Sequence, residues 1–242
     1  MPHFFITSDN IKNQKIFIND KENYNHIVKS LRAKIDENLL LIDEKEIQYE
    51  VKIENISSNS IETLVLNSYK STKKLDFDLF LAQSPLRSDA QQLIVEKATE
   101  LGVAGIYPIF SENCTVKKSV IEKKIQKWRK VMVEASKQCE RADIPACFGL
   151  SELDEITSIA FDRIVAFTER DADFSLKSYM RKNPIRKGEK ILVIIGPEGG
   201  FSEKEFNFFK DKKITTLSLG NLILRAETAV ITAIGNIIYE YE

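Results

Sequence analysis

The spacing of apolar residues changes near residue 70, and this change limits the chain to folds that have two different parts. Before this point, short apolar runs such as HFFIT and NLLLID are separated only by polar turns. Beyond it, similar runs alternate with helical patterns. Strands alone are typical of a small sheet or barrel, whereas strands alternating with helices indicate parallel βαβ units covered by helices on both faces.

The sequence pattern of the first part predicts a small β-barrel with one helix. Its strands are expected in the runs HFFIT, QKIFI, NLLLID, IQYEVKIE and SIETLVLN, which are rich in branched and aromatic residues. The run ENYNHIVKSLR at 22–32 is expected to be helical. The polar stretch NSYKSTKKLD at 67–76 is the expected linker.

The second part predicts an α/β domain built on a parallel sheet. Its strands are expected in FDLFLAQ, GIYPIF, ACFGL, RIVAFTE, KILVII and TTLSL. Helical patterns cover residues 88–102, 119–141, 202–212 and 226–241. Such alternation places the carboxyl ends of the strands at one edge of the sheet, where α/β proteins bind ligands.

The composition favours a globular, cytoplasmic protein without a membrane or metal partner. The 242 residues are 43% hydrophobic and 29% charged, with a net charge of −1. No apolar run approaches the ~18–20 residues of a membrane helix, and the N-terminus lacks the pattern of a signal peptide. The three cysteines form no CxxC pair and there are two histidines, so we expect reduced thiols and no metal site.

The predicted helix at 119–141 has one apolar stripe and one basic face. Segment 117–141 contains nine Lys and Arg against three Glu, a charge of +6. The basic residues with a helical spacing are Lys123, Lys127, Lys130, Lys137 and Arg141. This face is either merely solvated or turned toward RNA, and the pattern alone leaves both interpretations open.

The stretch IGPEGGF at 195–201 holds three of the nine glycines of the chain. It follows an apolar run and precedes a helix, but it matches neither a P-loop nor the GxGxxG dinucleotide fingerprint. Glu198 would also repel a phosphate, so a ligand with hydroxyl groups, an amine or a positive charge suits this loop better. Ser202 and Glu205 next to it form a predicted capping box.

A second glycine-containing turn, LSLGNLILRAETAV, lies at 217–230. Its apolar residues lead to Arg225, a cation at the positive end of the helix that we expect to begin near Ala226. This electrostatic misfit favours a functional role for Arg225. The alternative is a structural ion pair with Glu198 or Glu227.

Together, IGPEGGFS and LSLGNLILRAETAVITAI resemble the signature of the RsmE family of 16S ribosomal RNA uracil-N3 methyltransferases. The resemblance extends through IVEKATELGV at 94–103, KWRKVMVEASKQCERADIP at 127–145 and, weakly, HIVKSLR at 26–32. That family belongs to the SPOUT class of knotted enzymes that use S-adenosylmethionine. The resemblance implies an RNA-binding, PUA-like β-barrel over residues 1–70 and a SPOUT α/β domain with a parallel sheet and a trefoil knot over 75–242.

The same resemblance implies the residues of the site. Those expected to line the S-adenosylmethionine site are Thr168, Glu169, Ile195, Gly196, Gly200, Leu217, Leu219, Gly220 and Leu224. Arg225 is the expected catalytic residue, stabilising the charge that develops on the uracil, and Arg87 and His3 are the less favoured candidates for that role. No general base stands out in the sequence, and Glu198 is the candidate for that role.

The implied substrate is 16S rRNA, within the small ribosomal subunit. The residues expected to contact RNA are His3, Arg32, Arg87, Lys123, Lys127 and Lys130. The chain departs from the family at Pro2-His3-Phe4, where an arginine is missing, and at Asn113, where an arginine is common. Two other functions stay open: a SPOUT enzyme that methylates ribose or guanine, and a noncatalytic RNA-binding protein.

The C-terminal helical pattern predicts a homodimer. Val230, Ile234, Ile237 and Tyr241 form one stripe, and Ile231 and Ile238 would extend the apolar surface sideways. Such a surface is wider than the ~100° stripe of an ordinary amphipathic helix. A two-fold dimer that buries it is also what the resemblance implies, and a fully buried helix in a monomer is the alternative.

Overall fold

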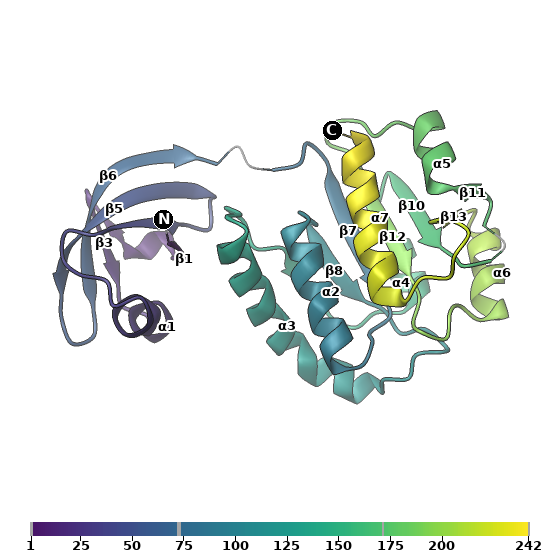
Figure 1. Cartoon of the computed structure of the whole chain (residues 1–242), viewed down its shortest axis with the longest axis horizontal. Helices are drawn as coiled ribbons and strands as arrows, with labels where there is room; N and C mark the ends of the chain where they lie inside the picture. Colours follow the sequence, from purple (N-terminus) through teal and green to yellow (C-terminus); the bar gives the residue numbers. More distant parts are fainter. Residues whose placement is uncertain (1, 72–73, 171, 242) are drawn as a thin grey trace. The chain divides into compact units, whose positions relative to one another are not determined.

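The computed structural model describes residues 2–71, 74–170 and 172–241. The chain divides into two compact units (Figure 1). The first comprises Met1–Lys74 with Ser136–Asp143, and the second Leu75–Ala135 with Ile144–Glu242. Among the helices in these described ranges, none combines the length and the apolar character needed to cross a membrane.

The first unit is built on a six-stranded sheet. Its order is β1 (His3–Phe5), β4 (Asn38–Ile42), β5 (Ile47–Ile56), β6 (Ile61–Lys70), β3 (Lys15–Ile18) and β2 (Ile11–Lys12). β1 pairs with β4 in parallel and the other neighbours are antiparallel. Alternate side chains point into one apolar core that includes Phe4, Ile16, Leu41, Val51 and Ile61. The five predicted strands of this part are confirmed.

Two boundaries in this unit differ from the sequence prediction. The predicted helix is interrupted: α1 (Lys21–Asn25) passes into a π-helical turn, η2 (His26–Ser30), and Arg32 then takes a left-handed φ of 54°. The predicted linker begins too early, because β6 continues to Lys70, which pairs with Ile47 on β5. Residues 72 and 73 of that linker lie outside the described residues.

The second unit contains a seven-stranded sheet in which every pairing is parallel, as the alternation of strands and helices predicts. Its order is β11 (Phe174–Ser175), β13 (Thr215–Ser218), β10 (Arg163–Phe167), β12 (Lys190–Ile195), β7 (Asp78–Gln83), β8 (Gly105–Pro108) and β9 (Ala146–Cys147). The central strand β12 is buried from its second residue to its end. Its continuous apolar run is therefore explained by the cover on both faces of the sheet.

Helices cover both faces of this sheet (Figure 1). One face shares its core with α2 (Ser88–Glu100), α3 (Lys118–Gln138), α5 (Leu176–Lys182) and α7 (Ala226–Tyr241). The other face packs against α4 (Leu153–Thr157) and α6 (Glu203–Asp211). The sequence patterns did not predict α4, α5 or β11, which are too short to show a helical or strand period.

Helix α3 ends earlier than predicted, so its basic face contains fewer residues than the sequence pattern indicates. The helix stops at Gln138, and Glu140 takes a left-handed φ of 61°. Arg141 is buried, with its Nη2 atom 2.7 Å from Oδ2 of Asp143. The prediction that Arg141 belongs to the solvent-facing basic stripe is therefore wrong. Lys123, Lys127 and Lys130 are exposed on the helix, as expected.

Helix α7 places most of its apolar stripe in the core of its own unit. Val230, Ile234 and Ile237 are buried, and the Tyr241 ring lies 4.7 Å from the Phe77 ring between centroids. The flanking residues Ile231 and Ile238 are half-buried. The apolar surface that α7 leaves exposed is thus narrower than the sequence predicts.

Candidate functional site

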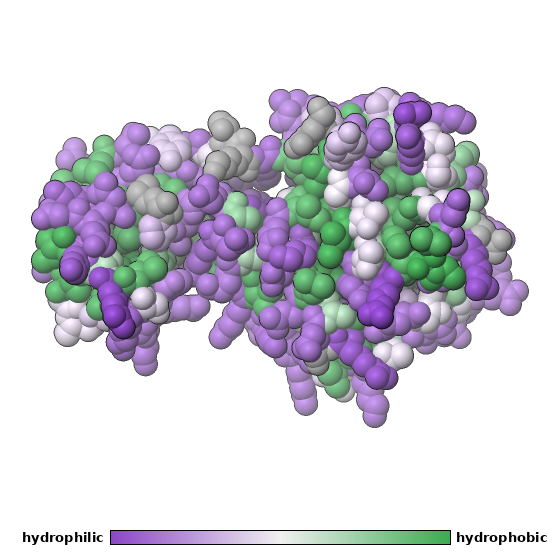
Figure 2. Space-filling view, in the orientation of Figure 1, coloured by the Kyte–Doolittle hydropathy of each residue, from purple (hydrophilic) through white to green (hydrophobic). Residues whose placement is uncertain are grey.

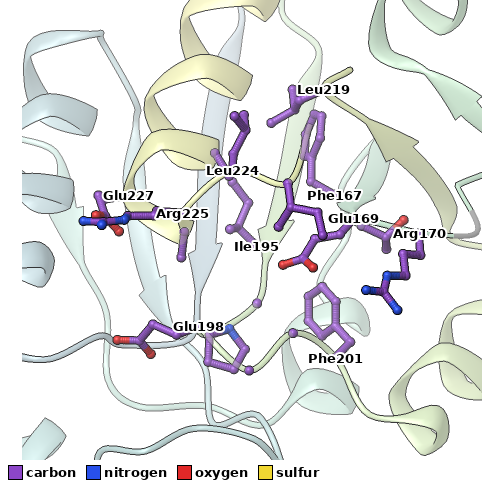
Figure 3. Close-up of a pocket in the computed structure, with 18 of the residues that line it drawn as sticks. Phe167, Glu169, Arg170, Ile195, Glu198, Phe201, Leu219, Leu224, Arg225 and Glu227 are labelled. Carbon is purple, nitrogen blue, oxygen red and sulfur yellow. The ribbon is translucent and has the colours of Figure 1, made fainter. Parts of the chain in front are cut away.

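A cavity of about 850 Å³ opens at the carboxyl ends of β10, β12 and β13 (Figure 3). Three loops line it: residues 167–170 after β10, residues 195–201 after β12, and residues 219–225 after β13. The first turn of α7 completes the wall. Because the three strands are parallel neighbours, their ends bring together loops that are far apart in the sequence.

The glycine loop, residues 196–200, forms one wall of the cavity. It turns sharply, with the amide of Gly200 donating to the carbonyl of Pro197 at 3.0 Å and a left-handed φ of +69° at Gly200. A Cβ atom at Gly200 would have no other atom within 4 Å, so its absence leaves open space at the backbone. Without a Cβ atom, another group can approach the backbone closely at this position.

The helix after the loop begins with the predicted capping box. Ser202 Oγ accepts a hydrogen bond from the amide of Glu205 at 3.3 Å, and Glu205 Oε2 accepts one from the amide of Ser202 at 2.8 Å. These bonds satisfy two amides that the first turn of α6 would leave unpaired. The start of α6 thereby fixes the C-terminal end of the glycine loop.

Thr168 supplies an unpaired polar atom to the wall formed after β10. The residue is 7% exposed, and its hydroxyl Oγ1 has no hydrogen-bond partner among the described residues. A buried unsatisfied hydroxyl costs about 1–3 kcal/mol. A ligand with a donor or acceptor at this position would remove that cost, whereas the fold itself gains nothing from the hydroxyl.

The loop after β13 contributes an apolar wall. Leu219 and Leu224 are half-buried at the cavity, while Leu222 and Ile223 are 82% and 60% exposed. Figure 2 shows hydrophobic side chains gathered over this loop, beside hydrophilic residues. Exposed apolar side chains next to a cavity are typical of a surface that binds a ligand or a partner.

Arg225 immediately precedes α7, where its carbonyl accepts from the amide of Ala229 at 2.8 Å. Its side chain is exposed and makes no hydrogen bond or ion pair with the described residues. The structural alternative, an ion pair with Glu198 or Glu227, is therefore not formed. Figure 3 places Arg225 and Glu227 on one side of the cavity and Arg170 on the other.

The structure brings together nearly all the residues that the sequence predicts for the cofactor and catalytic sites. Arg225, Glu198 and eight of the nine predicted cofactor residues line the cavity. Leu217 differs, because its side chain on β13 is fully buried in the core. Only its carbonyl reaches the loop region, where it accepts from the amide of Thr168 at 3.0 Å.

None of the predicted RNA-contact residues lines the cavity. His3 and Arg32 belong to the first unit. Arg87, at the start of α2, and Lys123, Lys127 and Lys130 on α3 are exposed on the second unit. The exposed positions of Arg87 and the three lysines are compatible with contacts to a large ligand.

Several cavity residues were not predicted. They include Phe167, Arg170, Phe201, Phe206, Leu222 and Ile223. Phe201 follows the glycine loop directly, and Arg170 follows Thr168 and Glu169, so adjacency in the sequence could have identified both. Phe206 lies one turn into α6, and no sequence signal distinguishes it from a core residue.

The chemistry of this cavity suits an amphipathic organic ligand. Its walls combine apolar side chains, open peptide groups and the unpaired Thr168 hydroxyl with the carboxylates of Glu169, Glu198 and Glu227. Such carboxylates can bind hydroxyl groups or a cationic centre. Across the described residues, no group of three or more His, Cys, Asp or Glu could hold a metal ion.

Two family models match the chain. The model described as an RNA methyltransferase domain matches residues 73–238, and the one described as an RNA methyltransferase PUA domain matches residues 18–66. Residues 73–238 include every residue that lines the cavity. The cavity therefore lies within the part of the chain that matches an RNA methyltransferase domain.

Relatives and solved structures match over nearly the full length. Ribosomal RNA small subunit methyltransferase E of Bacillus subtilis is 25% identical over 100% of this chain and 98% of its own. The protein of that name from Aquifex aeolicus is 30% identical over 84% and 86%. The crystal structure of the Neisseria gonorrhoeae protein of that name, bound to S-adenosyl methionine, is 25% identical with a TM-score of 0.85, covering 99% of this chain and 97% of that one. The chain thus belongs to the ribosomal RNA small subunit methyltransferase E family of RNA methyltransferases.

Proposed function

We propose that this protein uses S-adenosylmethionine to methylate N3 of a uracil in 16S rRNA of the small ribosomal subunit. The observation that carries the proposal is the guanidinium of Arg225, which has no partner among the described residues and lies at the same cavity as the glycine loop. A cofactor-sized cavity and a free cation beside it are what such a transfer requires. The names of the relatives, and the cofactor bound to the Neisseria gonorrhoeae protein, support the substrate and the cofactor.

The cavity residues fit the cofactor. We assign its adenine to the apolar wall of Leu219 and Leu224, and its polar atoms to the peptide groups of Ile195–Gly200 and the Thr168 hydroxyl. The carboxylate of Glu169 would accept hydrogen bonds from the ribose. When bound, the cofactor supplies an electrophilic methyl group on a positively charged sulfur.

At the uracil, the protein must remove a proton and stabilise charge. N3 carries a proton and becomes nucleophilic only when that proton leaves, which spreads negative charge over O2, N3 and O4. We assign stabilisation of this charge to Arg225, a role worth about 3–4 kcal/mol for a well-placed donor. Glu198, exposed at the same cavity, is the proposed proton acceptor. A deprotonated N3 stabilised by Arg225 would then be the nucleophile for the methyl group that the cofactor supplies.

We further propose a separate fold and function for each of the two parts of the chain. Residues 1–70 would form a PUA-like barrel that binds RNA, and residues 75–242 a SPOUT domain with a trefoil knot. The six-stranded sheet of the first unit supports the barrel, and the return of α7 against α2 after the last strand supports the knot. An enzyme acting on ribosomal subunits would work in the cytoplasm.

A homodimer is the proposed assembly. The exposed apolar residues Leu222, Ile223, Tyr239 and Leu93 lie on the loop before α7, on α7 and on α2. Burying them against a second copy would place a partner's residues beside the cavity. Sedimentation at micromolar concentration should give twice the 27.7 kDa chain mass, and a species near 27.7 kDa would reject the dimer.

Nucleoside mass spectrometry of 16S rRNA from a deletion strain tests the proposed reaction. We expect 3-methyluridine to disappear and to return when the wild-type gene is restored, but not when an Arg225→Ala gene is restored. Loss of a ribose-methylated nucleoside or a methylguanosine would instead identify another reaction. An unchanged set of nucleosides would reject a catalytic role in 16S rRNA.

A further inference from the structure

One side chain of the loop after β8, that of Asn113, forms hydrogen bonds with the backbone of the glycine loop. Asn113 Nδ2 donates to the carbonyl of Gly200 at 3.1 Å and lies 3.4 Å from the carbonyl of Gly199. These residues are more than eighty positions apart in the sequence. A Cβ atom at Gly199 would lie only 3.1 Å from Cβ of Asn113, so a side chain at this position would push Asn113 away by a few tenths of an ångström.

Glu205 forms a second link between the same two loops. Its side chain is 8% exposed. One carboxylate oxygen, Oε2, accepts from the amide of Ser202, and the other, Oε1, accepts from the amide of Glu112 at 3.3 Å. The carboxylate therefore does more than cap α6, since it also ties the loop that carries Asn113 to the end of the glycine loop.

These contacts lie outside the cavity wall and affect the cavity through the backbone of the glycine loop. Gly199 and Gly200 line the cavity, whereas Asn113 does not. An amide side chain has two N–H donors, and here they face two successive carbonyl groups. Fixing both carbonyls fixes the peptide planes on either side of Gly200, including its left-handed φ of +69°.

We propose that Asn113 is a positioning residue for the cofactor, holding the Gly199–Gly200 peptides in the orientation that binds S-adenosylmethionine. The inference rests on the proposed function of the cavity. Asn113 is exposed, so its loss removes no core packing. Its effect is expected on cofactor binding and loop rigidity rather than on the fold.

Two substitutions test this role. Asn113→Asp keeps the shape of the side chain but replaces the donor nitrogen with a carboxylate oxygen that repels both carbonyls, and Asn113→Ala removes the donors without adding charge. Asn207→Asp, on an exposed position of α6 outside the cavity wall, is the matched control for charge. Calorimetry should show cofactor affinity about threefold to tenfold weaker in both Asn113 variants and unchanged in the control, as expected for one or two neutral hydrogen bonds.

Hydrogen exchange without cofactor supplies a readout of positioning. The amide of Gly200, which bonds to the Pro197 carbonyl, should exchange faster in both Asn113 variants than in wild type or Asn207→Asp, with unchanged thermal unfolding. Equal cofactor affinity in wild type and the Asn113 variants, or an equal loss in the control, would overturn the inference. Failure of the wild-type protein itself to bind S-adenosylmethionine would overturn the proposed function, and the inference with it.

Discussion

The amide of Thr168, one residue beyond the last paired residue of β10, donates at 3.0 Å to the carbonyl of Leu217, the last paired residue of β13. This bond makes the two loops leave the sheet side by side, although they are about fifty residues apart in the sequence. It also holds the backbone of Thr168 at the cavity while its hydroxyl has no partner among the described residues. The position is thus fixed by the main chain, which leaves the side chain free to serve a ligand.

Thr168→Val should weaken cofactor binding without weakening the fold. The substitution keeps the shape of the side chain and removes an unsatisfied buried hydroxyl, so the free energy of unfolding should stay constant or rise by up to about 1 kcal/mol. Affinity for S-adenosylmethionine should fall about threefold to thirtyfold, because the ligand loses a hydrogen bond. Calorimetry and denaturant unfolding of the same protein measure both effects.

Thr63→Val is the matched control for Thr168→Val. Thr63 is also buried, but its hydroxyl donates to the carbonyl of Ile16 at 3.0 Å. Its replacement should lower the free energy of unfolding and leave cofactor affinity unchanged. If Thr168→Val destabilises the protein as much as Thr63→Val and binds cofactor normally, the hydroxyl has no role in binding.

Arg225→Lys should retain cofactor affinity and lose about 100-fold to 1,000-fold in single-turnover rate on RNA. A flexible ammonium group cannot reproduce the fixed fork of a guanidinium opposite a delocalised anion. Arg170→Lys is the control, because Arg170 is a second exposed arginine at the same cavity. Equal rates for wild type and Arg225→Lys would make Arg225 a structural residue.

Gly200→Val should prevent cofactor binding while the protein remains folded. A branched side chain would occupy the open space at the loop, but valine is also strained at a φ of +69°. Gly188→Val separates the two effects, since Gly188 has a φ of +78°, open space around it and no place in the cavity wall. Calorimetry should show no cofactor binding by Gly200→Val and normal binding by Gly188→Val. Normal binding by Gly200→Val would exclude the loop from the cofactor site.

The basic face of α3 should control the salt dependence of RNA binding. Each phosphate neutralised contributes about −0.7 to −0.9 to the slope of log affinity against log salt. Replacing Lys123, Lys127 and Lys130 by Gln should make the slope shallower by about 2 to 3. The control replaces three other exposed lysines of the same unit, Lys177, Lys182 and Lys210. If both triple variants gave the same slope, the α3 face would be a solvated surface without a specific role in RNA binding.

The sequence was most informative where local pattern and burial agree. Parallel strands and long helices were predictable because β12 reads as an uninterrupted apolar run and α3 has a clear apolar stripe. The end of α3 was not, because the helical spacing of apolar and basic residues continues through Cys139 and Arg141, past the left-handed turn at Glu140. Short elements such as α4 complete less than two turns and leave no periodic signal.

The candidate site was predictable loop by loop, but its internal contacts were not. The glycines around Pro197 and the misplaced charge of Arg225 could be identified as unusual from local rules alone. The hydrogen bonds from Asn113 to the glycine loop join segments of two different βα units, and asparagine in a loop is ordinary in composition. The unpaired state of the Thr168 hydroxyl likewise depends on which atoms surround it in the fold.

Transfer of an isotopically labelled methyl group to ribosomal subunits tests the central claim most directly. The purified protein would be incubated with S-adenosylmethionine carrying a deuterated methyl group and with small subunits from the deletion strain, followed by digestion of the 16S rRNA and nucleoside mass spectrometry. We predict labelled 3-methyluridine with wild type and at most about 1% of that initial rate with Arg225→Lys. Label in a ribose or a guanine, or no label from a protein that binds the cofactor, would contradict the account.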